Sequence, residues 1–201
     1  MIHNEIMNEQ TIKHLTPPIL TVDRTQRESL LSQTGKIIWF TGLSGAGKST
    51  LANALEIQLH EQGKQTFLLD GDVVRQGLNQ DLGFSDQDRT ENIRRIAHVA
   101  KLMMDAGLIV ICAFISPFKI ERRLARELAG DSRFIEVYLN TPMSVCEERD
   151  VKGLYQKARS GNLSNFSGIG SEYELPEHAE LTIDPSQESV DQATEKILPL
   201  I

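Results

Sequence analysis

Two kinds of segment alternate along the chain. Short apolar runs, typical of buried strands, occupy residues 36–41, 65–70, 108–115, 133–140 and 179–184. Longer segments in which apolar residues recur every three or four positions, typical of helices, occupy residues 48–61, 86–105, 118–128, 143–149 and 187–198. Strands that alternate with helices predict a parallel sheet of about five strands with helices on both faces, a three-layer α/β sandwich.

The start of the chain differs from this pattern. Residues 1–15 are polar and weakly periodic, and Pro17 and Pro18 follow them. We expect a mobile N-terminal extension over residues 1–22 and a single domain over residues 23–201. One short helix within residues 21–35 is expected before the first strand.

Composition restricts the class of protein. The 201 residues are 40% hydrophobic and 24% charged, with a formal net charge of −7. These values are typical of a globular domain, and the negative charge argues against general binding to nucleic acid or membranes. We find neither a signal peptide nor an apolar run of membrane-spanning length, and we expect Cys112 and Cys146 to be buried free thiols. Together these features favour a cytoplasmic protein.

A glycine-rich loop follows the first predicted strand. The sequence GLSGAGKS, residues 42–49, matches G-x-x-x-x-G-K-[ST], in which backbone N–H groups surround phosphates. Lys48 should reach the β- and γ-phosphates of ATP, and the Ser49 hydroxyl should bind Mg²⁺. The strand before and the helix after favour this interpretation over an ordinary glycine-rich turn. The loop therefore predicts a nucleoside triphosphate site, without specifying a kinase, formed by Gly42, Leu43, Ser44, Gly45, Ala46, Gly47, Lys48, Ser49 and Thr50.

Two aspartates end the second predicted strand. Asp70 and Asp72 should lie at the same edge of the sheet as the phosphate loop. Asp72 could orient or deprotonate an attacking hydroxyl, and Asp70 could hold Mg²⁺ through water. Capping of a following short helix is the alternative, and position alone leaves both open.

The long predicted helix carries polar residues on its apolar face. Ser85 is a suitable N-cap, with Asp88 three residues later. At 100° per residue, Arg89 and Asn92 fall on the same stripe as Ile93 and the apolar residues that follow it. An anionic ligand would satisfy these buried groups, whereas a helix end that emerges into solvent is the alternative.

A basic segment separates the fourth and fifth predicted strands. Arg149, Lys152, Lys157 and Arg159 lie close together, and glycines follow them. We interpret residues 150–175 as a lid over phosphates, with a solvated surface run as the alternative. Phe166 has few apolar neighbours in the sequence, so we expect an exposed ring that can stack on a base.

Four blocks together resemble the adenylylsulfate kinase (APS kinase) family. They are WFTGLSGAGKSTLA, LDGDVVRQGLNQDLGFSDQDRTENIRR, AFISPF and CEERDVKGLYQKARSGNLSNFSGIGSEYE, in the order of the family. The resemblance implies a P-loop NTPase-type fold. It also implies transfer of the γ-phosphoryl of MgATP to the 3′-hydroxyl of adenosine 5′-phosphosulfate (APS), which gives 3′-phosphoadenosine 5′-phosphosulfate and ADP. It further implies a homodimer, with ATP sulfurylase as a candidate partner.

The resemblance also assigns roles by position. Asp72 matches the aspartate near the acceptor hydroxyl, and Phe84 and Phe166 match the pair that encloses the acceptor's adenine. Ser116 matches a serine described as a phosphoserine intermediate, although direct in-line transfer to a bound hydroxyl needs no such intermediate. The implied APS-binding residues are Asp72, Arg75, Phe84, Arg89, Asn92, Ile115, Ser116, Lys152, Asn165 and Phe166.

Two positions depart from the family pattern. Val73 replaces an asparagine that usually follows D-G-D, and Gly170 replaces the aspartate of F-T-G-I-D. These departures are the best support for a rival interpretation, a kinase for another small acceptor such as shikimate or gluconate, but the phosphate loop, Asp72 and the arginines are retained. A nucleotide-dependent regulatory module is a second alternative, against which the separate acceptor residues argue.

Overall fold

A computed structural model describes residues 20–163 and 165–201. The extension predicted over residues 1–22 lies almost wholly outside the described residues, and its mobility stays a prediction. The strands are β1 (Lys36–Thr41), β2 (Thr66–Asp70), β3 (Ile109–Ala113), β4 (Phe134–Leu139) and β5 (Leu181–Ile183). The α-helices are α2 (Arg24–Leu31), α3 (Lys48–Glu61), α4 (Gly71–Arg75), α5 (Asp86–Asp105), α6 (Lys119–Ala129), α7 (Met143–Arg149), α8 (Leu154–Arg159) and α9 (Val190–Ile197), with short 3₁₀ turns at Asp131–Arg133 and Leu198–Leu200.

The five strands form one parallel sheet in the order β2-β3-β1-β4-β5. β1 is central and pairs with β3 on one side and with β4 on the other. The loop after β1 therefore leaves the middle of the sheet at the edge where all the carboxyl ends meet, the usual place for a ligand in such folds.

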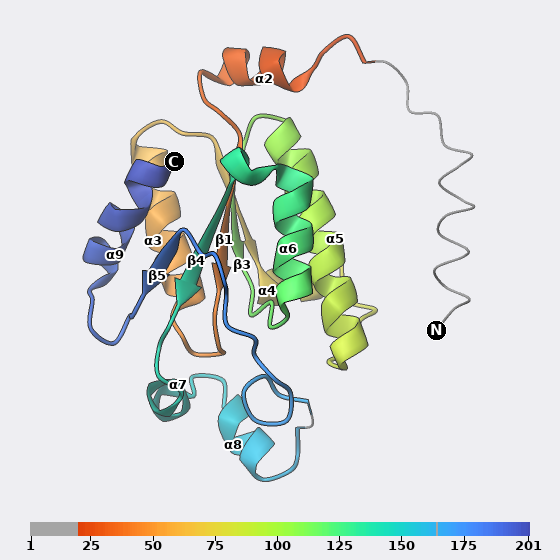
Figure 1. The fold of residues 1–201 in the computed structure, drawn as a ribbon, viewed down its shortest axis with the longest axis vertical. Helices are drawn as coiled ribbons and strands as arrows, with labels where there is room; N and C mark the ends of the chain where they lie inside the picture. Colours follow the sequence, from red (N-terminus) through yellow and green to blue (C-terminus); the bar gives the residue numbers. More distant parts are fainter. Residues whose placement is uncertain (1–19, 164) are drawn as a thin grey trace, which may run out of the picture.

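Both faces of the sheet are covered by helices, as predicted (Figure 1). Ile38 and Phe40 of β1 pack in the core beneath α3 and α9, whereas Ile37 and Trp39 pack in the core beneath α5 and α6. This alternation follows from the period of two in a strand, and it makes β1 apolar on both sides.

The N-terminus of α5 is fixed by its sequence. The Ser85 side chain accepts a hydrogen bond from the backbone N–H of Asp88, and the Asp88 carboxylate accepts one from the backbone N–H of Ser85. This reciprocal cap satisfies two N–H groups that the helix itself leaves unpaired. The predicted start of the helix and its predicted end at Asp105 are both confirmed.

One short helix, α8, was not predicted, and another, α4, was named only as the short helix of the capping alternative. Each of α4 and α8 spans less than two turns, so neither contains enough periodic positions to be recognised. Figure 1 shows α7 and α8 beyond the carboxyl end of β4, at the same end of the sheet as the loop that precedes α3. The segment predicted as a lid thus lies on the side of the molecule where a ligand is expected.

Two smaller predictions concern the core and membranes. Cys112 and Cys146 are buried free thiols, as predicted. Among the helices of the described residues, none is both long enough and apolar enough to cross a membrane.

Candidate active site

The loop between β1 and α3 has backbone geometry that favours glycine. Gly45 has φ +75°, and a Cβ atom there would lie 3.1 Å from the carbonyl oxygen of Cys146. Gly47, with φ +103°, precedes the first turn of α3. Left-handed backbone and close approach are the two reasons to require glycine. Because the N-terminus of α3 follows directly, its unpaired N–H groups and positive dipole end favour an anion at this loop.

Lys48 is folded back over this loop. Its Nζ atom donates to the carbonyl oxygens of Gly42 at 2.9 Å and Leu43 at 2.7 Å. Burial lowers the pKa of Lys48 to about 8. Loss of water destabilises the ammonium form, and a bound phosphate would restore its stability by supplying the opposite charge.

Ser49 and Asp70 meet beside the loop. The Ser49 hydroxyl donates to Asp70 Oδ2 at 2.6 Å, and Asp70 Oδ1 accepts the backbone N–H of Asp72 as the N-cap of α4. The capping alternative is therefore correct for Asp70, and the second oxygen still faces Ser49. A hydroxyl and a carboxylate are the hard oxygen ligands that Mg²⁺ prefers alongside substrate phosphates, so these side chains fit that ion.

Most of the predicted site residues line one large cavity. It has a volume of about 730 Å³ and a wall that includes the phosphate loop, the ends of β2 and β3, and parts of α5, α8 and α9. Its lining contains the predicted residues Ser44, Gly45, Gly47, Lys48, Ser49, Thr50, Asp70, Asp72, Arg75, Phe84, Arg89, Asn92, Ile115, Ser116, Lys152 and Phe166. The remaining predicted residues, Gly42, Leu43, Ala46 and Asn165, are not part of this lining.

Two arginines and an aromatic ring cluster at one end. The Arg75 guanidinium lies 4.5 Å from the centroid of the Phe84 ring, and that of Arg89 lies 5.8 Å from it. Arg89 is buried, and its Nη2 donates to the carbonyl oxygen of Asn165 at 3.0 Å. Burial and the positive charge of Arg75 lower the pKa of Arg89. Within the described residues neither arginine forms an ion pair with a carboxylate, so an anionic ligand would satisfy both.

Asn92 lies beside them on the buried face of α5, as its spacing predicted. Its Oδ1 accepts a hydrogen bond from Asn79 Nδ2 at 2.9 Å, and both side chains are buried. Because this bond occupies the oxygen, the amide nitrogen of Asn92 is the group left to donate to a ligand. The alternative, a helix end that emerges into solvent, is wrong for Arg89 and Asn92.

Asp72 forms an ion pair with Lys152. Their side chains are 64% and 53% exposed, so water screens the pair and its contribution to stability is small. The contact joins α4 to the segment predicted as a lid, across the mouth of the cavity.

The hydroxyl of Ser116 forms hydrogen bonds with two side chains of the protein. Its Oγ accepts from Trp39 Nε1 at 3.0 Å and donates to Thr41 Oγ1 at 3.0 Å. Thr41 Oγ1 in turn donates to the carbonyl oxygen of Ile115 at 2.7 Å. Ser116 is buried, and this chain of bonds makes its hydroxyl a structural link in the wall of the cavity.

The expected exposure of Phe166 is wrong. Its side chain is only 3% exposed and packs edge-on against Tyr155, with ring centroids 4.9 Å apart. Tyr155 Oη donates to the carbonyl oxygen of Ser44 in the phosphate loop at 2.9 Å. The apolar partners of Phe166 come from α8 and other distant segments, which local sequence could not reveal. Phe84 is 54% exposed, and both rings line the large cavity, so stacking on a base stays a prediction.

We expect Phe166→Ala to reduce stability and disturb both substrates. Truncation of a buried phenylalanine typically costs about 3–5 kcal/mol, and here it would also loosen Tyr155 under the phosphate loop. Phe84→Ala is the matched control, because its exposed ring contributes little to packing. For Phe84→Ala we expect an unchanged melting temperature and an acceptor KM raised about 5- to 100-fold, the effect of about 1–3 kcal/mol of lost stacking on a base. A Phe166→Ala variant with normal stability and a raised acceptor KM alone would contradict the packing role.

The other end of the cavity contains residues outside the predicted site. Arg149, the first residue of the basic run, is one of them. It donates to the carbonyl oxygens of Gly45 at 3.3 Å and Pro185 at 3.2 Å. Pro185, Glu188 and Ser189, which precede α9, also line this cavity. Arg149 stands in the fourth family block, but no motif marks the other three, because they reach the cavity only through the fold.

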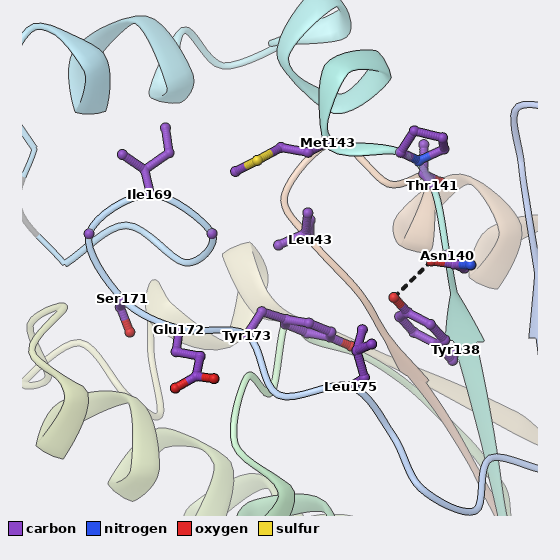
Figure 2. A pocket seen from close by; sticks show the side chains of 13 residues that line it. Leu43, Tyr138, Asn140, Thr141, Met143, Ile169, Ser171, Glu172, Tyr173 and Leu175 are labelled. Atoms are coloured by element: carbon purple, nitrogen blue, oxygen red, sulfur yellow. Dashed lines mark hydrogen bonds between the residues drawn. The ribbon is translucent and has the colours of Figure 1, made fainter.

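A second, more open cavity of about 580 Å³ lies on another side of the phosphate loop. Figure 2 shows Leu43 between Met143 of α7 and Tyr173, and the Tyr173 ring stacks on that of Tyr138 with centroids 6.0 Å apart. Leu43 thus turns its side chain away from the large cavity, and only its backbone belongs to the phosphate site.

The fold and the large cavity define the class of protein. A phosphate loop after the central strand, a lysine over that loop and a separate cationic cluster in the same cavity are the features of a P-loop kinase. The model of the family Adenylylsulphate kinase matches residues 34–184. The chain belongs to this family.

Known proteins agree with that assignment. An adenylyl-sulfate kinase of Erwinia tasmaniensis is 53% identical over 194 residues, which cover 96% of this chain and 94% of that protein. The bifunctional enzyme NodQ of Rhizobium tropici is 62% identical over 162 residues, 81% of this chain but 26% of that enzyme. The structure of the Mycobacterium tuberculosis APS kinase CysC in complex with AMPPNP and APS is similar, with a TM-score of 0.80, 46% identity, and coverage of 84% of this chain and 98% of that chain.

Proposed function

We propose that this chain transfers the γ-phosphoryl group of ATP to the 3′-hydroxyl of APS, giving 3′-phosphoadenosine 5′-phosphosulfate and ADP. The observation that carries the proposal is the single cavity in which the phosphate loop faces a separate cluster of Asp72, Arg75 and Arg89. Membership of the adenylylsulphate kinase family supports the choice of acceptor.

The donor belongs at the phosphate loop. Backbone N–H groups of the loop and the N-terminus of α3 bind its phosphates, and Lys48 moves from two carbonyl oxygens to the β- and γ-phosphates. Ser49 and Asp70 would hold Mg²⁺, Asp70 through water, and the ion would neutralise phosphate charge. The base of the nucleotide extends toward Arg149 and Pro185, the part of the cavity that adjoins the loop on that side.

The acceptor belongs at the arginine cluster. Arg75 and Arg89 bind the anionic phosphosulfate, and this bond offsets the burial that lowers the pKa of both guanidinium groups in the free protein. Asn92 donates from its amide, and the exposed Phe84 ring offers a surface for the adenine. Ile115 and Ser116 also line this cavity.

Asp72 and Lys152 act at the junction of the two substrates. Asp72 orients the 3′-hydroxyl and accepts its proton as the phosphoryl group transfers in line. Lys152, ion-paired with Asp72 in the free protein, turns toward the substrates when residues 150–175 close over them. Most of the catalysis consists of positioning and charge neutralisation, which phosphoryl transfer requires above all.

Val73 and Gly170, the two departures from the family pattern, do not line the large cavity of the described structure. Val73 is exposed on α4, and Gly170 lines the second cavity instead. We therefore propose that neither changes the choice of acceptor.

Ser116→Ala should retain part of the activity. The hydroxyl of Ser116 is buried between Trp39 and Thr41, so in-line transfer proceeds without a phosphoserine intermediate. The alanine variant loses both hydrogen bonds and leaves Trp39 Nε1 without an acceptor, which typically costs about 1–3 kcal/mol; this cost falls on stability and would leave measurable turnover. Incubation of the wild-type chain with labelled ATP alone provides the check. A folded but inactive alanine variant, together with a wild-type phosphoenzyme that passes its label to APS, would contradict direct transfer.

Phosphoryl transfer from labelled ATP to APS, with shikimate and gluconate in parallel, tests the proposed function. We expect label in APS alone. Transfer to another acceptor would support the rival kinase, and ATP binding without any transfer would support the regulatory module. Assembly as a homodimer, association with an ATP sulfurylase, the requirement for Mg²⁺ and a cytoplasmic location remain proposals.

A further inference from the structure

Arg122 lies behind the wall of the acceptor end and contacts three separate parts of the chain. Its Nη1 donates to the carbonyl oxygen of Ser116 at 2.6 Å, and its Nη2 donates to the carbonyl oxygen of Glu174 at 2.7 Å. Its Nε lies 2.9 Å from Glu136 Oε1 on β4, with both side chains buried. A planar guanidinium can donate to two carbonyl oxygens in fixed directions while its charge faces a carboxylate, which a single ammonium group cannot do in the same geometry.

The segment that Arg122 holds has a disfavoured backbone conformation. Ser116 has φ +40°, in the left-handed region that a residue with a side chain rarely adopts. Such a conformation persists only where neighbouring groups enforce it. Arg122 fixes the carbonyl of Ser116, while Thr41 fixes the carbonyl of Ile115.

The end of the predicted lid is attached to the same wall. The backbone N–H of Glu174 donates to the carbonyl oxygen of Pro117 at 2.9 Å, and its Oε2 accepts the backbone N–H of Lys119 at 2.6 Å. Tyr173 Oη lies 2.9 Å from Thr41 Oγ1, immediately before the phosphate loop, and Figure 2 shows its ring beside that loop. The wall, the phosphate loop and the residues that end the 150–175 segment thus meet around Arg122.

We propose that Arg122 is a positioning residue for the acceptor. It holds the Ile115–Ser116 wall in its strained conformation and joins to it the last residues of the lid, at Tyr173 and Glu174. Arg122 does not line the cavity itself, so it acts on APS through these residues. This inference rests on the proposed function, because it concerns the acceptor end of that site.

Arg126 provides a matched control on the same helix. It lies one turn further along α6, 3.6 Å from Glu136, and it also pairs with Glu180. Its guanidinium lies over the ring of Phe134, as that of Arg122 lies over the ring of Tyr173. Its backbone bond is to His178, outside the acceptor wall. Arg126→Lys therefore perturbs a similar ionic environment without releasing Ser116.

The test compares Arg122→Lys with Arg126→Lys in steady-state kinetics with APS and ATP. Lysine keeps the charge beside Glu136 but cannot bridge Ser116 and Glu174 together. For Arg122→Lys we expect an APS KM raised about tenfold, as for one lost charge-assisted hydrogen bond, and an ATP KM within about twofold of wild type. For Arg126→Lys we expect both constants to stay within about twofold. Melting temperatures of both variants identify any general loss of structure.

Glu174→Ala tests the attachment of the lid end to the wall at a second bond if Arg122→Lys does not fold, and it keeps the Glu174 carbonyl oxygen that Arg122 binds. This substitution removes the hydrogen bond from the backbone N–H of Lys119. We expect the APS KM to rise threefold or more, roughly the effect of one neutral hydrogen bond, and the ATP KM to stay unchanged. Equal behaviour of the two lysine variants, a parallel rise of both KM values, or an unchanged APS KM for Glu174→Ala would overturn the positioning role. A wild-type chain that neither binds nor phosphorylates APS would instead overturn the proposed function, and with it the inference.

Discussion

Lys48→Ala should abolish measurable phosphoryl transfer and leave the fold intact. Lys48 is the cation of the phosphate loop, and its contacts in the free protein are two carbonyl oxygens that phosphate oxygens can replace. Removal of one contact that stabilises developing charge in the transition state typically lowers kcat about 10²- to 10³-fold. Turnover of APS and ATP by the variant, with its melting temperature, measures both parts of the prediction.

The depressed pKa of Lys48 adds a pH dependence to this prediction. Because burial lowers that pKa to about 8, the free protein loses the ammonium charge as the pH rises through this value. We expect kcat/KM for ATP, which reports the free protein, to fall above pH about 8. At saturating ATP the bound phosphates favour the protonated amine, so kcat should stay flat over the same range.

Lys64→Ala controls for the loss of a positive charge, since Lys64 lies in the loop just before β2, outside the large cavity. It should keep wild-type turnover and the wild-type pH profile. Near-normal transfer by Lys48→Ala would exclude the phosphate loop as the donor site.

The fold was predictable because its signals are local and redundant. β1 is apolar on both sides, and a glycine loop and a capped helical pattern follow it, so pattern, spacing and turn chemistry all indicate the same element. α5 shows the same agreement, with Ser85 at its start and buried residues every three or four positions to Met104. Arg89 and Asn92 stood out because they break that pattern, and the conflict with burial indicated a ligand site.

Other parts of the site depend on contacts between distant segments. Phe166 is buried against Tyr155 and within the hydrophobic core beneath α3 and α9, and its neighbours in the sequence do not indicate this burial. No pattern in the sequence marks Arg122, whose buried charge is compensated by the carboxylate of Glu136 and by two carbonyl oxygens. Such buried networks form only when several elements meet, so periodicity along one helix cannot predict them.

Asp72→Asn should lower kcat about 10²-fold, at the low end for removal of a general base, and leave the ATP KM within about twofold. Asparagine keeps the size of the side chain and can still orient the 3′-hydroxyl, but it cannot accept the proton. The lost ion pair with Lys152 is exposed, so the melting temperature should change little and the kinetic effect can be attributed to the site.

Asp81→Asn is the matched control for this last prediction. Asp81 is also an exposed aspartate in an ion pair, with Arg95, and its side chain is 57% exposed against 64% for Asp72. It lies outside the large cavity, so the same chemical change should leave kcat and both KM values unaltered. The two variants together separate the loss of a surface charge from the loss of the carboxylate at the acceptor hydroxyl. If Asp72→Asn keeps its turnover and loses only ATP affinity, Asp72 belongs with Ser49 and Asp70 in the metal site, and the proton of the 3′-hydroxyl must leave by another route.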